Sequence, residues 1–176
     1  MTAQDVTFRA AAPNDTSRVL AFARQTFEET FGAANDPEDM RQYLAAAFTQ
    51  AQQTADISAN DCRVIIAEKQ GVLVAYATVK DRACPLPIDA PHAVQLERFY
   101  VDPAHQGSGL AQRLMRQVLT RAGDMGATHL WLGVWEHNAR GIRFYENQHF
   151  DDIGSVPFTL GTAAQTDRVM ARKLNR

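Results

Sequence analysis

The sequence has few cysteines and no long apolar run. Only two of its 176 residues are cysteine, Cys62 and Cys84, and they form no C-x-x-C pair. We expect no disulfide framework or cysteine-rich zinc site, and both thiols should be reduced, as in the cytoplasm. No stretch reaches the roughly 20 apolar residues of a membrane helix, and the first residues lack the basic and apolar regions of a signal peptide. These absences predict a cytoplasmic protein without a membrane partner.

An excess of charge is missing as well. The chain has 18 Lys and Arg against 20 Asp and Glu, for a net charge of −2. Binding to nucleic acid regardless of sequence requires a basic face, so nucleic acid is not an expected partner. The five histidines have no metal-ligand spacing, and Ser108 lacks the G-x-S-x-G setting of a hydrolase nucleophile. Neither a metal site nor a serine hydrolase is therefore expected.

The apolar pattern predicts one α/β (α+β) domain over residues 1–176, because neither half could bury a core alone. Apolar residues at helical spacing predict helices at 15–31, 36–48, 108–125 and 138–147. Alternating or continuous apolar runs predict strands at 6–10, 63–68, 72–79, 94–101, 128–135, 150–160 and 167–174. The polar stretch 49–61 predicts a loop. The predicted element order is roughly βααβββαβαββ.

The strand at 94–101 contains a conflict of side-chain parity. Val94 and Leu96 share one face, whereas Phe99 and Val101 have the opposite parity. Side chains alternate between the two faces of a strand, so both pairs can be buried on one face only if an extra residue is inserted. We therefore predict a β-bulge near residues 97–98.

The segment between this strand and the next helix has the composition of a phosphate-binding loop. Small residues at Gly107, Gly109 and Ala111 permit close backbone approach, and the helix that follows directs free N–H groups to the same place. A Walker loop would need Gly-Lys-Ser/Thr, and a dinucleotide fingerprint would need a glycine at Gln112. The pattern Q-x-x-G-x-A from Gln106 fits best, while a simple tight turn into a helix stays open.

The surrounding residues make this pattern more specific. The run Leu96-x-x-Phe99-Tyr100-Val101-x-Pro103-x-x-Gln106-x-x-Gly109-x-Ala111 resembles the acetyl-coenzyme A motif of the GNAT superfamily of N-acetyltransferases. Val134-x-x-x-Asn138, followed by Phe144-Tyr145-Glu146-Asn147, is similar to that family's second motif. The resemblance covers about residues 94–174. It implies a mixed central sheet of about seven strands with helices on both faces, and a bulged strand at 94–101.

The resemblance also implies roles for individual residues, with acetyl-CoA as co-substrate and no metal. The backbone of Phe99, Tyr100 and Val101 would pair with the pantetheine arm, and Asn138 would hydrogen-bond the cofactor. The pyrophosphate would lie on the loop residues Gln106, Gly107, Ser108, Gly109, Leu110 and Ala111. Two positions depart from the family pattern: Gly141 replaces the usual alanine, and Gln148-His149 replace the Leu-Gly that ends the helix.

The reaction implied by the resemblance is direct transfer of acetyl to a primary amine in a ternary complex. An alkylammonium has a pKa of about 10.4, so supplying the neutral amine at pH 7.4 costs about 4 kcal/mol. Glu97, on the bulged strand, is our candidate for accepting that proton through water, and a surface carboxylate is the alternative. Tyr145 is implied as the general acid for the departing thiolate.

The acceptor is left open by the sequence. Segments 26–31 and 35–44 resemble the bacterial spermidine/spermine N-acetyltransferase branch, and an acidic rim would attract a polycation. That rim consists of Glu28, Glu29, Asp36, Glu38 and Asp39. The same acids could equally stabilise helix ends. A peptide N-terminus or another small-molecule amine are the alternatives, as is a non-catalytic acyl-CoA sensor. A homodimer also stays open.

Overall fold

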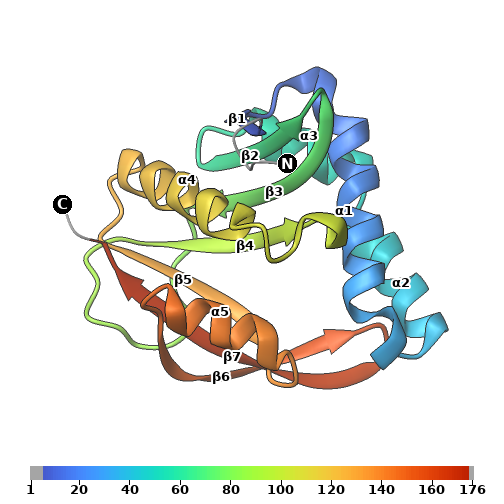
Figure 1. The fold of residues 1–176 in the computed structure, drawn as a ribbon. Coiled ribbons are helices and arrows are strands. Elements are labelled where there is room, and N and C mark those ends of the chain that lie inside the picture. Colours follow the sequence, from blue (N-terminus) through green and yellow to red (C-terminus); the bar gives the residue numbers. More distant parts are fainter. Residues whose placement is uncertain (1–5, 175–176) are drawn as a thin grey trace.

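A seven-stranded mixed sheet organises the chain in the computed structural model, which describes residues 6–174 (Figure 1). The strands are β1 (Val6–Ala10), β2 (Cys62–Lys69), β3 (Val72–Lys80), β4 (Ala93–Val101), β5 (His129–Trp135), β6 (Asp151–Leu160) and β7 (Ala163–Lys173). Their spatial order is β1-β2-β3-β4-β5-β7-β6. Neighbours are antiparallel except for β4 and β5, which run parallel and are joined through a helix. The predicted seven-stranded α/β fold is confirmed.

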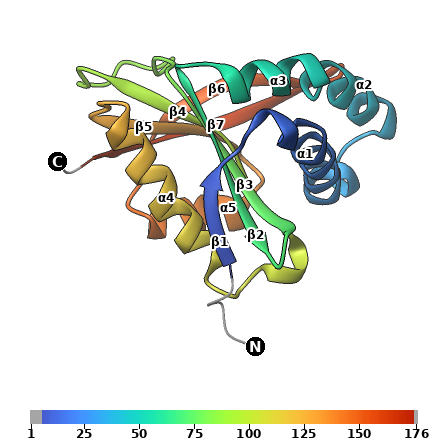
Figure 2. The same ribbon diagram turned by 90° about the horizontal axis from the view of Figure 1, so that it is seen from above.

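Helices cover both faces of this sheet, as predicted (Figure 2). One face carries α4 (Leu110–Asp124) and α5 (Ala139–Asn147), and its core includes Leu114, Val118 and Leu130. The other carries α1 (Thr16–Phe31), α2 (Pro37–Ala47) and α3 (Gln50–Ser58), around Phe27 and Tyr76. Short 3₁₀ turns at 13–15, 32–34 and 103–105 link these elements.

The predicted bulge is confirmed. Thr78 of β3 pairs with Arg98, but the next residue of β3, Val79, pairs with Leu96, so Glu97 is the extra residue. As a result, Val94, Leu96, Phe99 and Val101 all contact the core on the α4 side. The inserted residue therefore resolves the parity conflict in the way the side-chain period requires.

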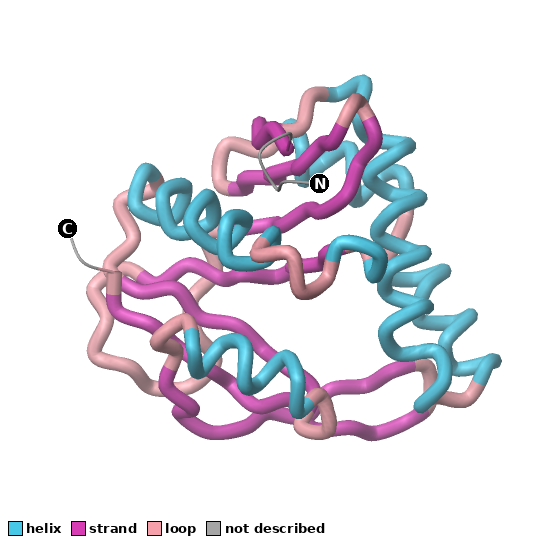
Figure 3. The backbone as a smooth tube through the Cα atoms, in the orientation of Figure 1, coloured by secondary structure: helices cyan, strands magenta, loops and turns pink. Residues whose placement is uncertain are grey.

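Strands β4 and β5 pair only over a short segment. Their register covers residues 93–95 against 129–131, and beyond it the strands diverge, as Figure 3 shows. The carboxyl half of β4 is therefore unpaired on that side. This divergence sets the position of the site described below.

The prediction of a loop at 49–61 was wrong, because α3 occupies residues 50–58. Thr49 caps this helix: its Oγ1 accepts the Gln52 N–H at 3.2 Å, and Gln52 Oε1 accepts the Thr49 N–H at 3.3 Å. This reciprocal capping box, T-x-x-Q, satisfies two N–H groups that helix ends leave unpaired. The final strand also begins earlier than predicted, at Ala163, directly after a tight turn at Gly161.

The end of α5 shows how the chain compensates for a missing glycine. His149 has a φ of 62°, the left-handed conformation that glycine usually supplies after a helix. The Phe150 N–H then donates to the Tyr145 carbonyl at 3.0 Å. The departure from the family pattern at 148–149 therefore leaves the helix end intact.

Candidate active site

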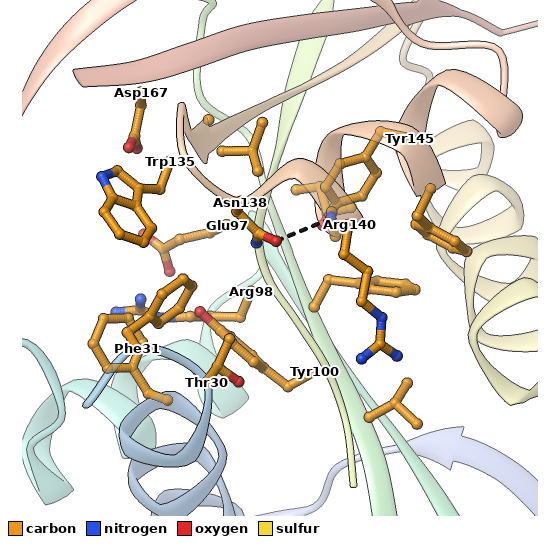
Figure 4. A pocket seen from close by; sticks show the side chains of 18 of the residues that line it. Thr30, Phe31, Glu97, Arg98, Tyr100, Trp135, Asn138, Arg140, Tyr145 and Asp167 are labelled. Carbon is orange, nitrogen blue, oxygen red and sulfur yellow. Dashed lines mark hydrogen bonds between the residues drawn. The ribbon is translucent and has the colours of Figure 1, made fainter. Parts of the chain in front are cut away.

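A cavity of about 590 Å³ lies where β4 and β5 separate. Its walls come from both faces of the sheet: α1 and α2 on one side, the α4 loop and α5 on the other. Figure 4 shows Thr30, Phe31, Trp135 and Asp167 on one side of this space and Asn138, Arg140 and Tyr145 on the other. The cavity therefore offers two approaches to a common centre at β4.

The loop before α4 forms an anion-binding arrangement on the α5 side. Gly107 and Gly109 have φ values of 76° and 81°, which side chains disfavour, so these positions require glycine. Gly109 also caps α4, whose first turn leaves N–H groups without helical partners. Arg140 of α5 donates to the Gln106 side chain at 2.6 Å, which brings a positive charge to the same loop. Backbone donors, helix dipole and guanidinium together suit a diphosphate.

Tyr145 lies in an aromatic cluster beside this loop. Its ring centroid is 6.2 Å from that of Phe99, 5.4 Å from Phe144 and 5.7 Å from Phe150. Burial raises the pKa of its hydroxyl well above the ordinary value. The phenol is therefore protonated at neutral pH.

Asn138 caps α5 and faces the cavity. Its Oδ1 accepts the Gly141 N–H at 2.9 Å. An ideal Cβ placed on Gly141 would lie 2.7 Å from Asn138 Nδ2, so the glycine gives this side chain its space. Gly141, which replaces the alanine usual in the family, therefore leaves room for the Asn138 side chain.

Glu97, the bulged residue, lines the cavity with a carboxylate that is already ion-paired. Lys80 Nζ lies 2.7 Å from Oε2, and Arg82 Nη1 lies 3.3 Å from Oε1. Only 18% of the Glu97 side chain is exposed. A water-mediated proton transfer to Glu97 would therefore take place at a carboxylate held by two cations.

Arg98 occupies the α2 side of the cavity. Its guanidinium lies 4.2 Å from the centroid of the Phe48 ring. Among residues 6–174 it forms no ion pair with a carboxylate. This end of the cavity is therefore positively charged.

Most of the site residues predicted from sequence line this one cavity. They are Glu97, Phe99, Tyr100, Val101, Gln106, Gly107, Gly109, Ala111, Asn138 and Tyr145. Two do not: the Ser108 hydroxyl donates to the His105 carbonyl at 2.6 Å, and the Leu110 side chain is buried in the α4 core. These two could serve a ligand through their backbone N–H groups alone.

The predicted acidic rim is absent from the cavity wall, since none of its five residues lines it. Asp36 caps α2, Glu38 pairs with Arg41, and Asp39 accepts hydrogen bonds from Thr162. Asp36, Glu38 and Asp39 therefore have local structural contacts, and none of the five acids lines the cavity.

The sequence patterns did not indicate Arg98, Arg140 and Asp167 as site residues. Arg98 and Arg140 lie at positions that the motifs leave open, and Asp167 lies in the last predicted strand with no role assigned to it. Only the fold brings the first turn of α5 and the middle of β7 to the cavity. The described residues hold no group of three His, Cys, Asp or Glu that could bind a metal ion. Over the same residues no helix has the length and apolar character needed to span a membrane.

The model of the acetyltransferase (GNAT) family matches residues 20–150. The chain belongs to this family. An uncharacterised N-acetyltransferase of Mycobacterium tuberculosis is 31% identical over 163 residues, which cover 91% of this chain and 98% of that protein. The chain is accordingly an N-acetyltransferase, and acetyl-CoA is the acyl donor of its family.

Other GNAT proteins are similar over different extents. The structure of the PaiA N-acetyltransferase of Thermoplasma acidophilum in complex with coenzyme A superposes with a TM-score of 0.78, at 17% identity, over 96% of this chain and 98% of that one. A spermine/spermidine N(1)-acetyltransferase of Bacillus subtilis is 26% identical over 82 residues, which cover 46% of this chain and 50% of that protein. The GNAT fold thus extends over nearly the whole chain, and similarity to the polyamine enzyme is partial.

Proposed function

We propose that this chain transfers acetyl from acetyl-CoA to a primary amine by direct attack in a ternary complex, with Tyr145 as the general acid. The observation that carries the proposal is the partly buried phenol of Tyr145, which lines the same cavity as the glycine loop before α4. When bound, acetyl-CoA supplies a thioester whose acyl carbon is open to attack by an amine. The GNAT membership of the chain supports this reaction class.

The residues present fit the donor. The N–H groups at the start of α4 and the Arg140 guanidinium would hold the diphosphate. The unpaired edge of β4 at 99–101 would offer backbone groups to the pantetheine amides, and Asn138 would add a side-chain hydrogen bond. Tyr145 would give its proton to the thiolate that leaves. Glu97 would accept the proton of the amine through water.

A polyamine is one candidate acceptor, favoured by the partial similarity to the Bacillus subtilis enzyme. The local roles of the rim acids and the positive charge of Arg98 weigh against a polycation. We therefore test a polyamine, a peptide N-terminus and a small monoamine as acceptors in one panel.

Two free thiols, Cys62 and Cys84, agree with the cytoplasm as the place of action.

The test measures release of the coenzyme A thiol from acetyl-CoA with spermidine, spermine, an N-terminal peptide and butylamine. We expect turnover with at least one amine and a loss of tenfold or more in kcat for Tyr145→Phe, because a general acid typically contributes about 10²–10⁴-fold. Tyr76→Phe is the matched control, because it also removes a buried phenol hydroxyl but lies outside the cavity. Binding of acetyl-CoA without any turnover would favour the sensor alternative and refute the proposed transfer to a primary amine.

A further inference from the structure

The α1 side of the cavity holds a carboxylate without a partner. Asp167, on β7, lines the cavity, and its carboxylate forms no hydrogen bond or ion pair within residues 6–174. Burial raises its pKa to about 6, because nothing nearby compensates for the loss of water around the charge. Asp167 is half-buried, so a cation bound to its carboxylate would offset part of the hydration that the charge has lost.

The sheet makes room for this carboxylate. An ideal Cβ on Gly133 of β5 would lie 3.1 Å from Asp167 Oδ2, so the carboxylate occupies the space beside the glycine. A glycine inside a strand weakens that strand and often marks a close approach. Here the missing side chain of Gly133 leaves room for the Asp167 carboxylate in the cavity wall.

Aromatic rings stand beside the carboxylate. Trp135 is the cross-strand partner of Asp167, so the two side chains lie on the same face of the sheet. The Trp135 ring packs edge to face against Phe31 of α1, with 6.2 Å between centroids. Figure 4 shows Asp167 next to the Trp135 indole, with Phe31 on the α1 side. Aromatic faces next to a carboxylate attract ammonium groups.

The other carboxylate of the cavity is already neutralised. Glu97 contacts both Lys80 and Arg82, whereas no cation within residues 6–174 pairs with Asp167. The donor-side groups, Tyr145 and Asn138, belong to the α5 face, so an acceptor has the α1 side as its approach. An incoming ammonium would therefore meet Asp167 as the uncompensated negative charge of the cavity.

We propose that Asp167 binds the ammonium group of the acceptor, in a subsite walled by Trp135 and Phe31. This proposal rests on the proposed transferase function and names the residue that selects its acceptor. One carboxylate fits one ammonium, so the subsite suits an amine whose neighbouring carbons are apolar and contact the rings.

The test replaces Asp167 by asparagine, which keeps the shape and removes the charge. For every amine of the panel that turns over, we expect Asp167→Asn to raise KM about tenfold, the size of losing a charged hydrogen bond. The Kd for acetyl-CoA should stay within twofold of the wild-type value. Asp151→Asn, an exposed carboxylate at the start of β6, is the control that should change neither.

A second variant keeps the negative charge of Asp167 but displaces its carboxylate. Gly133→Ala places a methyl group against Asp167 Oδ2 and should also raise the amine KM while leaving acetyl-CoA binding unchanged. If Asp167→Asn does not fold, Gly133→Ala serves as the test of the ammonium subsite. An amine KM equal to that of the wild type in the variants that fold would overturn the proposal.

The failure of the transferase function gives a different result. If wild-type protein acetylates no amine of the panel, that function is refuted, and Asp167 is judged by binding alone. Butylammonium chloride should then raise the Tm of wild-type protein, against sodium chloride at equal ionic strength, and have no such effect on Asp167→Asn. Equal shifts in both proteins, or no shift in the wild type, would overturn the ammonium subsite.

Discussion

Replacing Gly141 by alanine tests how the start of α5 is built. The Gly141 N–H donates to Asn138 Oδ1 at 2.9 Å, so the two residues form the helix cap together. An ideal Cβ at position 141 would lie 2.7 Å from Nδ2 and 2.9 Å from Cγ of Asn138. An alanine there would therefore push the capping side chain out of its place.

Two effects of similar size then oppose each other. Replacing glycine by alanine in a helix stabilises it by up to about 1 kcal/mol. Losing an asparagine N-cap costs about 1 kcal/mol. We expect Gly141→Ala to change the free energy of unfolding by less than ~0.5 kcal/mol. Gly123 of α4 has no atom within 4 Å of an added Cβ, so Gly123→Ala should give the full gain.

Urea unfolding of a double-mutant cycle measures the coupling. Asn138→Ala alone should cost about 1 kcal/mol, and Gly141→Ala in that background should recover most of it, because the obstructing side chain is gone. Each step of about 1 kcal/mol corresponds to roughly 2–4 °C in Tm for a chain of this size. If Gly141→Ala stabilises as much as Gly123→Ala, and its effect simply adds to that of Asn138→Ala, the steric reasoning is refuted.

Three further predictions concern charge and thiols. Arg9 and Arg18 hold the pKa of the buried Asp15 carboxyl below its ordinary value, so folding stability should fall as the pH drops below about 4, and Asp15→Asn should flatten this dependence in acid-unfolding curves. Burial raises the pKa of Cys62 to about 12, so a thiol reagent should label Cys84 first in the native protein and both residues after unfolding. Arg140→Gln should raise the Kd for coenzyme A several-fold at low salt and less at high salt, whereas the same change at the exposed Arg143 should not.

Much of the fold followed from local periodicity. The bulge in β4 could be predicted because alternation is strict: Leu96 and Phe99 cannot be buried on one face without an inserted residue, and the register at Thr78 and Val79 shows that insertion. Helix α3 was missed because its residues are mostly polar. Its signal was the capping box of Thr49 and Gln52, which is independent of apolar period.

The residues proposed to bind the donor could be predicted from the sequence, whereas those proposed to bind the acceptor could not. The glycine loop and Tyr145 lie in continuous motifs, so their spacing along the chain carries the information. The acceptor side combines Phe31, Trp135 and Asp167 from α1, β5 and β7, and no spacing links them. The acidic residues of the predicted rim were hard to interpret from sequence for a related reason. Helix capping and cation binding use the same residue types, and only the contacts in the structure distinguish the two roles.

The inserted Glu97 connects these two sides. Beyond the insertion Phe99 and Val101 turn toward the α4 and α5 face, where the glycine loop and Tyr145 lie. Tyr100 turns toward α1 and packs near Phe27, 6.3 Å between ring centroids. Without the extra residue each side chain after it would exchange faces, since the period is two. A single added residue thus gives β4 one wall toward the proposed donor site and one toward the proposed acceptor subsite, at the point where β5 has already diverged.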